Sequence, residues 1–294
     1  MLATKKHLSL LLSATLLLPA CSWFSSDVHK IDTITQAEQE LSRATPNTLI
    51  IFDIDQTLAN PTEQLFNLLY LSVSDFALAD HPFIKKLIAN NPDLKAARKG
   101  FNHQPTFVGA LFTKSSFIPV EQKTITLAKD AQARGAKVIA LSSVNTGELG
   151  SIPSMQQWRV KNLHQIGLDF SASFPQQELT FTQLPPEYGT PPAFYQGVLC
   201  ASRNPKGKVL VAFLEKINWK PANILFFDDS KEQCESVIHE MKKLGIPTIS
   251  YWYRAAYLAK IKLDQKLIQQ QMDHWATHKE FLSTQEFSEK TKTD

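Results

Sequence analysis

The sequence lacks the features that mark several common classes of protein. Its 294 residues include only three cysteines, and no Cys/His spacing suggests a zinc site. The formal net charge is only +3, so nothing indicates a surface that binds nucleic acid or another polyanion. No internal repeat is visible, which gives no support to a solenoid or a propeller. What remains is an ordinary globular composition, with enough residues for one large domain or one domain with an insertion.

A long apolar run is also missing, and the best candidate lies near the start. Leu8–Leu18 is too short to span a bilayer and follows two lysines, which predicts an export signal over residues 1–20. Cys21 comes directly after an alanine and resembles a bacterial lipobox, in which this cysteine becomes the lipidated first residue. The resemblance implies an exported protein anchored to the bacterial cell envelope, on the periplasmic or outer-membrane face; an ordinary signal peptide is the alternative. Removal of residues 1–20 leaves a formal charge of +1, so the net charge predicts no partner.

Two cysteines remain beyond the export signal, Cys200 and Cys234. An exported location permits a disulfide, and the sequence does not say whether the two meet. Free cysteines are among the most buried residue types. We therefore expect two isolated, buried thiols.

Two carboxylates spaced by two, Asp53 and Asp55, are the most informative feature of the chain. They follow the apolar run 49–52, which is typical of a strand buried on both faces. Because the side-chain period of extended backbone is two, both acids can point the same way while Ile54 points into the protein. Adjacent acids repel, burial raises that cost, and a cation beside them would remove it. An Asp-rich turn after the strand is the alternative.

Two further apolar segments end in polar residues, Ser142 and the pair Asp228-Asp229. Helical segments between the strands end at glycines, and this alternation indicates a parallel α/β sheet. Because parallel strands end at one edge of the sheet, where such sheets bind ligands, these polar groups are expected to converge. The expected strands are 49–52, 137–141, 223–227 and 248–252.

The order of these residues resembles the haloacid dehalogenase (HAD) superfamily of phosphohydrolases. The resemblance covers residues 47–60 and 120–252. It implies a HAD-like Rossmannoid parallel sheet, with helices on both faces and a mainly helical cap inserted between the first and second motifs. The matching positions are Asp53, Asp55 and Thr57 for the Asp-x-Asp-x-Thr motif, Ser142 for the second motif, Lys206 for the third, and Asp228 with Asp229 for the fourth.

The resemblance gives the two acids of the first motif different roles. Asp53 is the nucleophile that takes the phosphoryl group as an aspartyl-phosphate. Asp55 protonates the leaving oxygen and then activates water, while Thr57 supports the motif. Dehalogenase members of the superfamily lack the second acid, so its presence favours phosphate chemistry.

The other motif residues are expected to bind phosphate and metal. Mg²⁺ prefers oxygen ligands, and Asp53, Asp228 and the backbone carbonyl of Asp55 are the expected set. Ser142 donates to a phosphate oxygen, and Lys206 supplies a positive charge to phosphate and Asp53. The last acid of the set, Asp229, orients Lys206 or a water on the metal.

Two of these positions have close competitors. Ser143 is as suitable as Ser142 by composition, although the strand end favours Ser142. Lys208 competes with Lys206, which is preferred because Lys-Gly opens the following helix as in the family, and a helix N-terminus favours phosphate. The arginine that often follows the second-motif Ser or Thr in relatives is absent here.

The expected layout is a signal at 1–20, a tether and helix at 21–46, a core at 47–60 and 120–294, and a cap at 61–119. Such caps exclude water and select the leaving group. Aromatic residues of the cap are expected either to line the substrate cavity or to form the core of the cap: Phe101, His103, Phe107 and Phe112. A second, smaller insertion is possible at 170–204.

The sequence therefore predicts a Mg²⁺-dependent phosphomonoester hydrolase acting on a small phosphorylated substrate. The opening motif is also similar to that of class C lipoprotein acid phosphatases, but Asp228-Asp229 departs from their last motif. A receiver domain is disfavoured, because there the paired acids come first and the phosphorylated Asp later. The alternative is a surface lipoprotein or effector on a HAD scaffold that acts by binding. Neither the substrate nor the oligomeric state is indicated.

Overall fold

The computed structural model describes residues 27–74, 81–186, 189–258 and 263–293. The predicted export signal at 1–20 and the lipidation site at Cys21 lie outside these residues.

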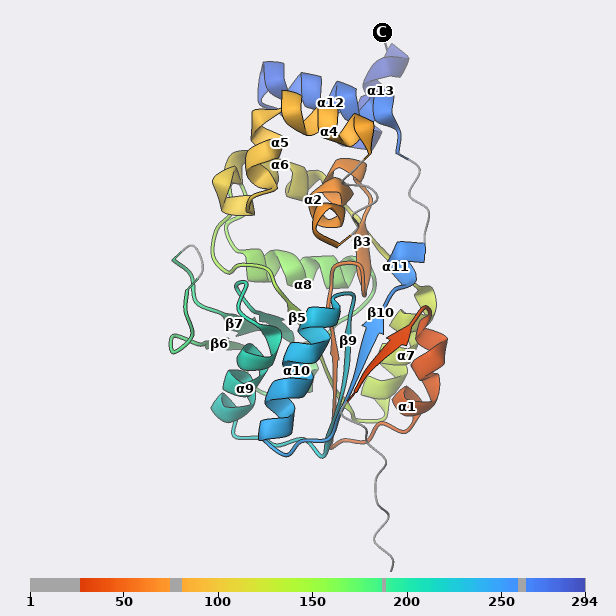
Figure 1. Cartoon of the computed structure of the whole chain (residues 1–294), viewed down its shortest axis with the longest axis vertical. Coiled ribbons are helices and arrows are strands. Elements are labelled where there is room, and N and C mark those ends of the chain that lie inside the picture. The colour runs from red at the N-terminus through yellow and green to blue at the C-terminus, as the bar shows by residue number, and fades with distance from the viewer. Residues whose placement is uncertain (1–26, 75–80, 187–188, 259–262, 294) are drawn as a thin grey trace, which may run out of the picture.

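One large, mostly parallel sheet forms the body of the molecule (Figure 1). Its strands lie in the order β1-β10-β9-β2-β5-β8-β7-β6. All neighbours from β1 to β8 run parallel, and β7 and β6 add an antiparallel edge. This architecture confirms the predicted α/β fold with a parallel sheet. The strands are β1 (Val28–Ile31), β2 (Thr48–Phe52), β5 (Lys137–Ser142), β6 (Glu178–Thr180), β7 (Ala193–Tyr195), β8 (Val198–Cys200), β9 (Asn223–Asp228) and β10 (Thr248–Tyr253).

Helices cover both faces of the sheet because the central strands are apolar on both sides. In β2, Leu49 and Ile51 pack into the core beneath α9 and α10, whereas Ile50 and Phe52 pack on the opposite face with α1, α7 and α8. Among the described helices, none is long and apolar enough to cross a membrane. The covering helices are α1 (Glu38–Ser42), α7 (Gln122–Ala133), α8 (Met155–Gln165), α9 (Lys206–Lys216) and α10 (Lys231–Lys243).

The two cysteines belong to different cores. Cys200 packs on the face of α7 and α8, and Cys234 packs on the face of α9 and α10. Both are buried and free. The prediction of two isolated buried thiols is confirmed, since the sheet lies between them.

The segment before the first motif adds to the sheet. A tether and one helix are expected at 21–46, but β1 pairs in parallel with β10 at the sheet edge. A short 3₁₀ turn, η1 (Ile34–Ala37), then leads into α1. Glu121 attaches this segment to the core, because its carboxylate accepts hydrogen bonds from Thr33 Oγ1 (2.7 Å), the Ile34 N–H (2.8 Å) and the Tyr253 hydroxyl. The described part of this segment therefore packs as part of the core, and does not form a tether.

The predicted cap region forms a helical layer above the carboxyl edge of the sheet (Figure 1). It leaves and rejoins the core through a short antiparallel ribbon of β3 (Ala59–Pro61) and β4 (Phe117–Pro119). The three longest of its helices are amphipathic or apolar, and Phe107 and Phe112 are buried among them. The helices are α2 (Gln64–Ser74), α4 (Pro82–Asn90), α5 (Pro92–Ala97), η2 (Phe101–His103) and α6 (Pro105–Lys114).

The last helices pack on this cap layer, although the sequence suggests assigning them to the core. After α11 (Ala255–Leu258), the chain rises to α12 (Gln265–His278) and α13 (Thr284–Thr293), at the top of Figure 1. Asp93 of α5 accepts hydrogen bonds from Trp275 Nε1 (2.7 Å) and Lys279 Nζ (2.9 Å). Buried Glu63 accepts from the Thr284 hydroxyl at 2.9 Å. We therefore place α12 and α13 with the cap, because acids of the cap satisfy their polar groups.

Candidate active site

The site lies where β2 and its two neighbours end. Phe52 of β2 pairs with Phe227 of β9 on one side and with Ala140 of β5 on the other. One residue further, the Asp53 N–H donates to the Phe227 carbonyl at 2.8 Å. The predicted convergence of the strand ends is therefore observed, and it brings Asp53 beside Asp228.

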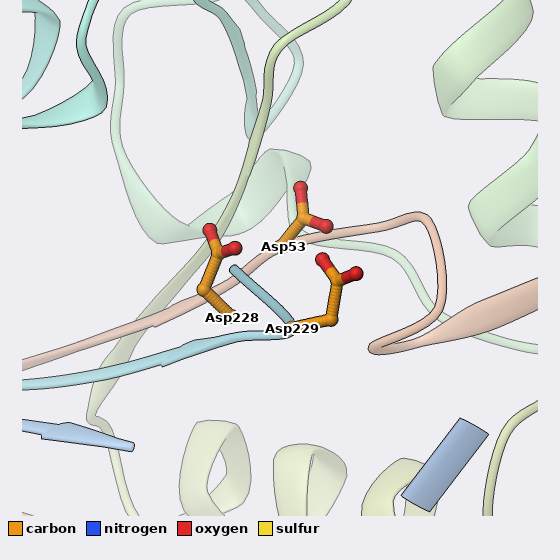
Figure 2. A group of neighbouring side chains, drawn as sticks. All are labelled: Asp53, Asp228 and Asp229. Atoms are coloured by element: carbon orange, nitrogen blue, oxygen red, sulfur yellow. The ribbon is translucent and has the colours of Figure 1, made fainter. Parts of the chain in front are cut away.

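Three carboxylates form a cluster at these strand ends. Oxygens of Asp53, Asp228 and Asp229 all lie within 4.8 Å of one another. Figure 2 shows the three side chains on the same side of the two strand ends, around a common space. Asp53 is only 5% exposed and Asp228 only 1%. The cluster differs from the predicted ligand set because it includes the Asp229 side chain.

Lys206 neutralises part of this negative charge. Its Nζ lies 2.5 Å from Asp53 Oδ1 and 2.6 Å from Asp228 Oδ2. Burial alone would lower the pKa of Lys206, but the charges of Asp228 and Asp53 raise it above its ordinary value. The structure brings Lys206, and not the exposed Lys208, to Asp53. The competition between these two lysines is resolved by burial.

The start of α9 is held tightly against α10, and this positions Lys206. The Lys206 N–H donates to Gln233 Oε1 at 3.0 Å. A Cβ on the next residue, Gly207, would lie 2.2 Å from the Ser236 carbonyl oxygen. Only glycine permits this approach of the two helices, which explains the Lys-Gly pair in physical terms.

Burial makes full ionisation of the acidic cluster costly. Burial and the charge of Asp53 raise the pKa of Asp228 to about 7, although Lys206 opposes this. Burial, then the charges of Asp228 and Asp53, raise the pKa of Asp229 well above its ordinary value, although the Tyr257 hydroxyl donates to it at 2.7 Å. A divalent cation would relieve the repulsion, and three carboxylates suit Mg²⁺ because this ion prefers oxygen ligands. The donor set therefore fits the metal that the sequence predicts.

The second acid of the motif has a partner that sequence reasoning missed. Arg159 of α8 is fully buried, and its Nη1 and Nη2 lie 2.9 and 2.5 Å from the two oxygens of Asp55. Burial, and then the charge of Asp53, raise the pKa of Asp55, while Arg159 opposes them. A signal was present, because Arg159 lies four residues from both Met155 and Leu163 on the apolar face of the helix. A charged residue on that face needs a buried partner.

The loop after β2 turns both acids of the motif into one cavity. Asp53 and Asp55 line this cavity, whereas Ile54 is buried in the core, as the period of two predicts. The turn is closed by Gln56, which has φ 59° and donates its N–H to the Ala59 carbonyl at 3.0 Å. Thr57 is fully buried, and its hydroxyl has no hydrogen-bond partner among the described residues. Its position is consistent with support of the loop.

The two candidate serines lie differently. Ser142 is fully buried, and its Oγ accepts a hydrogen bond from the Val144 N–H at 3.4 Å. Ser143 lines the cavity with Val144 and Asn145, and Ser142 does not. The structure therefore places Ser143, and not Ser142, at the cavity wall, because the strand ends at Ser142 with its side chain buried.

A cavity of about 820 Å³ lies between the sheet edge and the cap. Its floor carries the acids, Lys206 and Arg159, and its cap wall carries Leu69, Ala97, Arg98 and Phe101. Of the four aromatic residues expected either to line the cavity or to build the core of the cap, Phe101 lines the cavity, Phe107 and Phe112 build the core, and His103 is exposed. Besides Lys206 and Arg159, the basic residues that line it are Arg98, Arg203, Lys231 and Arg254.

Comparisons with known proteins identify a family. The family model described as "Protein of unknown function (DUF2608)" matches residues 30–288. An uncharacterized protein of Rickettsia felis is 23% identical over 274 residues, covering 84% of this chain and 86% of its own. One of Rickettsia prowazekii is 22% identical over 235 residues, covering 79% of each chain. A second from that organism is 31% identical over 120 residues, covering 40% of each.

Among solved structures, a HAD family enzyme from Bacteroides thetaiotaomicron, determined as a magnesium complex, is a distant match. It covers 69% of this chain and 92% of that one, at 14% identity and a TM-score of 0.32. The relatives' names state no activity, and this structural likeness is slight. A function for this chain therefore has to be inferred from the residues of its own site.

Proposed function

The chain belongs to the DUF2608 family, and we propose that it is a Mg²⁺-dependent phosphomonoester hydrolase of HAD type that acts through an aspartyl-phosphate. One observation carries the proposal. Lys206 bridges Asp53 and Asp228 at 2.5 and 2.6 Å, at the ends of neighbouring strands. The motif resemblance requires these three residues to meet, although 153 positions separate Asp53 from Lys206.

Asp53, Asp228 and Asp229 would hold the metal. When bound, Mg²⁺ supplies positive charge that offsets the repulsion between an anionic nucleophile and an anionic phosphate. Lys206 adds a second positive charge beside Asp53, and its hydrogen bond orients that carboxylate for attack.

The first step transfers the phosphoryl group to Asp53. A carboxylate oxygen of Asp53 attacks phosphorus, and the bond from phosphorus to the alcohol oxygen breaks. Asp55 gives its proton to that leaving oxygen. Burial raises the pKa of Asp55, which favours the protonated form needed here. Because Arg159 donates to both oxygens of Asp55, protonation of Asp55 weakens the bond to the oxygen that carries the proton.

The second step releases phosphate. Asp55, now ionised, takes a proton from a water molecule, and the oxygen of that water attacks phosphorus. The bond between phosphorus and Asp53 breaks, and inorganic phosphate leaves with Asp53 restored as a carboxylate. Ser143 at the cavity wall is suited to donate to a phosphate oxygen in both steps.

Hydrolysis of p-nitrophenyl phosphate by the purified mature chain tests this proposal. We expect turnover with Mg²⁺ and none above background with EDTA. Asp53→Asn removes the nucleophile, so kcat should fall by about a thousandfold or more. Asp130→Asn is a matched control, because this acid is exposed on α7 and outside the cavity. Equal rates for wild type and Asp53→Asn would overturn the proposal.

A binding role on the same scaffold is supported by one specific feature. Both oxygens of Asp55 are engaged by Arg159, and an acid held in this way as a carboxylate cannot donate a proton. A protein that only binds phosphorylated ligands would give calorimetric binding to wild type without turnover. Asp55→Asn would then leave that affinity almost unchanged, whereas a hydrolase would lose kcat.

A further inference from the structure

The cap wall of the cavity carries a cation that has no counter-charge among the described residues. Arg98 follows α5 and lines the cavity. Its guanidinium makes no hydrogen bond or ion pair with any described residue. Burial lowers the pKa of Arg98, and no acid of the described residues raises it. A partly desolvated guanidinium loses hydration, and this loss is recovered only when an anion binds.

The other charged residues of the cavity lining also favour an anionic ligand. Apart from the acidic cluster, Asp55 and their partners Lys206 and Arg159, the described cavity lining holds four basic residues and one acid, Glu232. Of these basic residues, Arg254 lies on the core side, with its guanidinium 5.1 Å from the centre of the Trp252 ring. Basic side chains therefore lie on the cap wall of the cavity as well as on its floor.

A buried carboxamide oxygen on a residue of the cavity lining also has no partner among the described residues. Gln56 is 5% exposed and lines the cavity, and its Oε1 has no hydrogen-bond partner among the described residues. A buried carboxamide without a partner costs free energy, which a ligand hydroxyl would recover by donating to it. The cavity is thus prepared for a polar ligand that extends past the phosphate.

We propose that the leaving group of the substrate carries a second anionic group, a carboxylate or a phosphate, and that Arg98 of the cap binds it. This inference rests on the proposed hydrolase function. The products are inorganic phosphate and an alcohol that keeps the second anion. The cap thereby selects doubly anionic phosphomonoesters from those with neutral alcohols.

Three six-carbon substrates test the proposal with full-length mature protein and Mg²⁺. Glucose 6-phosphate has a neutral remote end, 6-phosphogluconate has a carboxylate there, and glucose 1,6-bisphosphate has a phosphate. We expect kcat/KM to be about 10- to 100-fold higher for at least one anionic substrate than for glucose 6-phosphate, the range that a charge-assisted hydrogen bond provides. The anionic substrate with the higher kcat/KM shows whether the second anion is a carboxylate or a phosphate.

Arg98→Gln should reduce this ratio of kcat/KM values by about tenfold or more, and Arg98→Lys should keep most of it, because the charge remains. Arg43→Gln is a matched control, since this arginine is exposed and outside the cavity. Thermal unfolding of each variant checks the fold. Equal kcat/KM for the three substrates, or the same ratio in Arg98→Gln as in wild type, would overturn the inference and leave the hydrolase proposal standing.

Absence of turnover on all substrates, including p-nitrophenyl phosphate, would instead reject the hydrolase proposal. Calorimetry on wild type and Arg98→Gln then tests separately whether Arg98 binds a second anion. Tighter binding of glucose 1,6-bisphosphate or 6-phosphogluconate than of glucose 6-phosphate, lost in Arg98→Gln, would support it. Equal binding of the three ligands, or no binding, would overturn it.

Discussion

Arg159 shows how a single buried residue can set the state of a proposed catalytic acid. Its side chain is fully buried and joins Asp55 through two parallel hydrogen bonds. A buried ion pair adds little net stability, yet removing one partner leaves the other charge uncompensated. The pair therefore positions Asp55 more than it stabilises the fold.

Arg159→Met should lower the free energy of unfolding by roughly 3 to 5 kcal/mol, because Asp55 is left buried without its partner. The double variant Arg159→Met/Asp55→Asn should recover much of this loss. Urea denaturation of wild type, both single variants and the double variant gives the coupling energy. A single variant that costs less than about 1 kcal/mol would contradict the geometry, because that is the cost of an exposed pair.

Lys206 and Lys208 give a second comparison at the scale of single residues. Lys206→Met should lower kcat by about 10²- to 10³-fold, the typical effect of removing one preorganised charge at the reacting group. Lys208→Met should leave kcat within about twofold, because that side chain is exposed. Steady-state kinetics on p-nitrophenyl phosphate distinguish them. Similar losses in both variants would reject the assignment of Lys206.

At the scale of elements, the contact between α9 and α10 positions Lys206. Gly207→Ala places a Cβ 2.2 Å from the Ser236 carbonyl oxygen, so the helices must separate. We expect a loss of about 1 to 3 kcal/mol in the free energy of unfolding, as in other overpacked sites, together with reduced kcat. Lys208→Ala, on the exposed side of α9, is the control. An unchanged melting temperature for Gly207→Ala would show that α9 can shift freely.

Asp93 connects α5 of the cap to α12. Burial works to raise the pKa of Asp93, but hydrogen bonds from Lys279 and Trp275 lower it below its ordinary value of 3.8. Because the folded pKa is the lower one, the stabilisation is present above the ordinary value and is lost as pH falls through the folded pKa. Acid should therefore loosen the attachment of α12 to the cap.

Hydrogen exchange of α12 tests this at matched pH. Asp93→Asn should speed exchange of α12 amides relative to wild type at about pH 7, and the difference should narrow toward about pH 3 as Asp93 takes up its proton. Asp130→Asn, on the core, is the control. A difference that stays constant over this range would contradict the role of the Asp93 charge.

For the whole molecule, the acidic cluster predicts a stability that depends on metal. A ligand that binds only the folded state stabilises it by about 2.7 kcal/mol at about 100 times its Kd. In a chain of this size each kcal/mol raises Tm by roughly 2 to 4 °C. Mg²⁺ should therefore raise Tm over EDTA by about 5 °C or more at saturating concentration.

Thermal unfolding with Mg²⁺ and with EDTA measures this shift. Asp228→Asn removes one carboxylate of the cluster and should abolish the shift. Asp130→Asn should retain it, because that residue lies on α7, outside the cluster. A Tm that is the same with Mg²⁺ and EDTA in wild type would argue against a metal site at these strand ends.

The sequence by itself determined the elements and the chemistry of their ends. Strands β2, β5, β9 and β10 were predictable because short, continuous apolar runs are typical of strands that are buried on both faces of a parallel sheet. The convergence of Asp53 and Asp228 followed from topology, since parallel strands end at one edge. These inferences depend on residues that are neighbours in sequence or on a rule of chain direction.

Tertiary structure decided what depends on contacts between distant segments. Arg159 meets Asp55 across 104 positions, Trp275 meets Asp93 across 182, and β1 joins the sheet beside β10. Periodicity indicates that a residue is buried but not which partner it meets there. The placement of Ser143 and Arg98 at the cavity wall likewise depends on packing, which no local sequence pattern indicates.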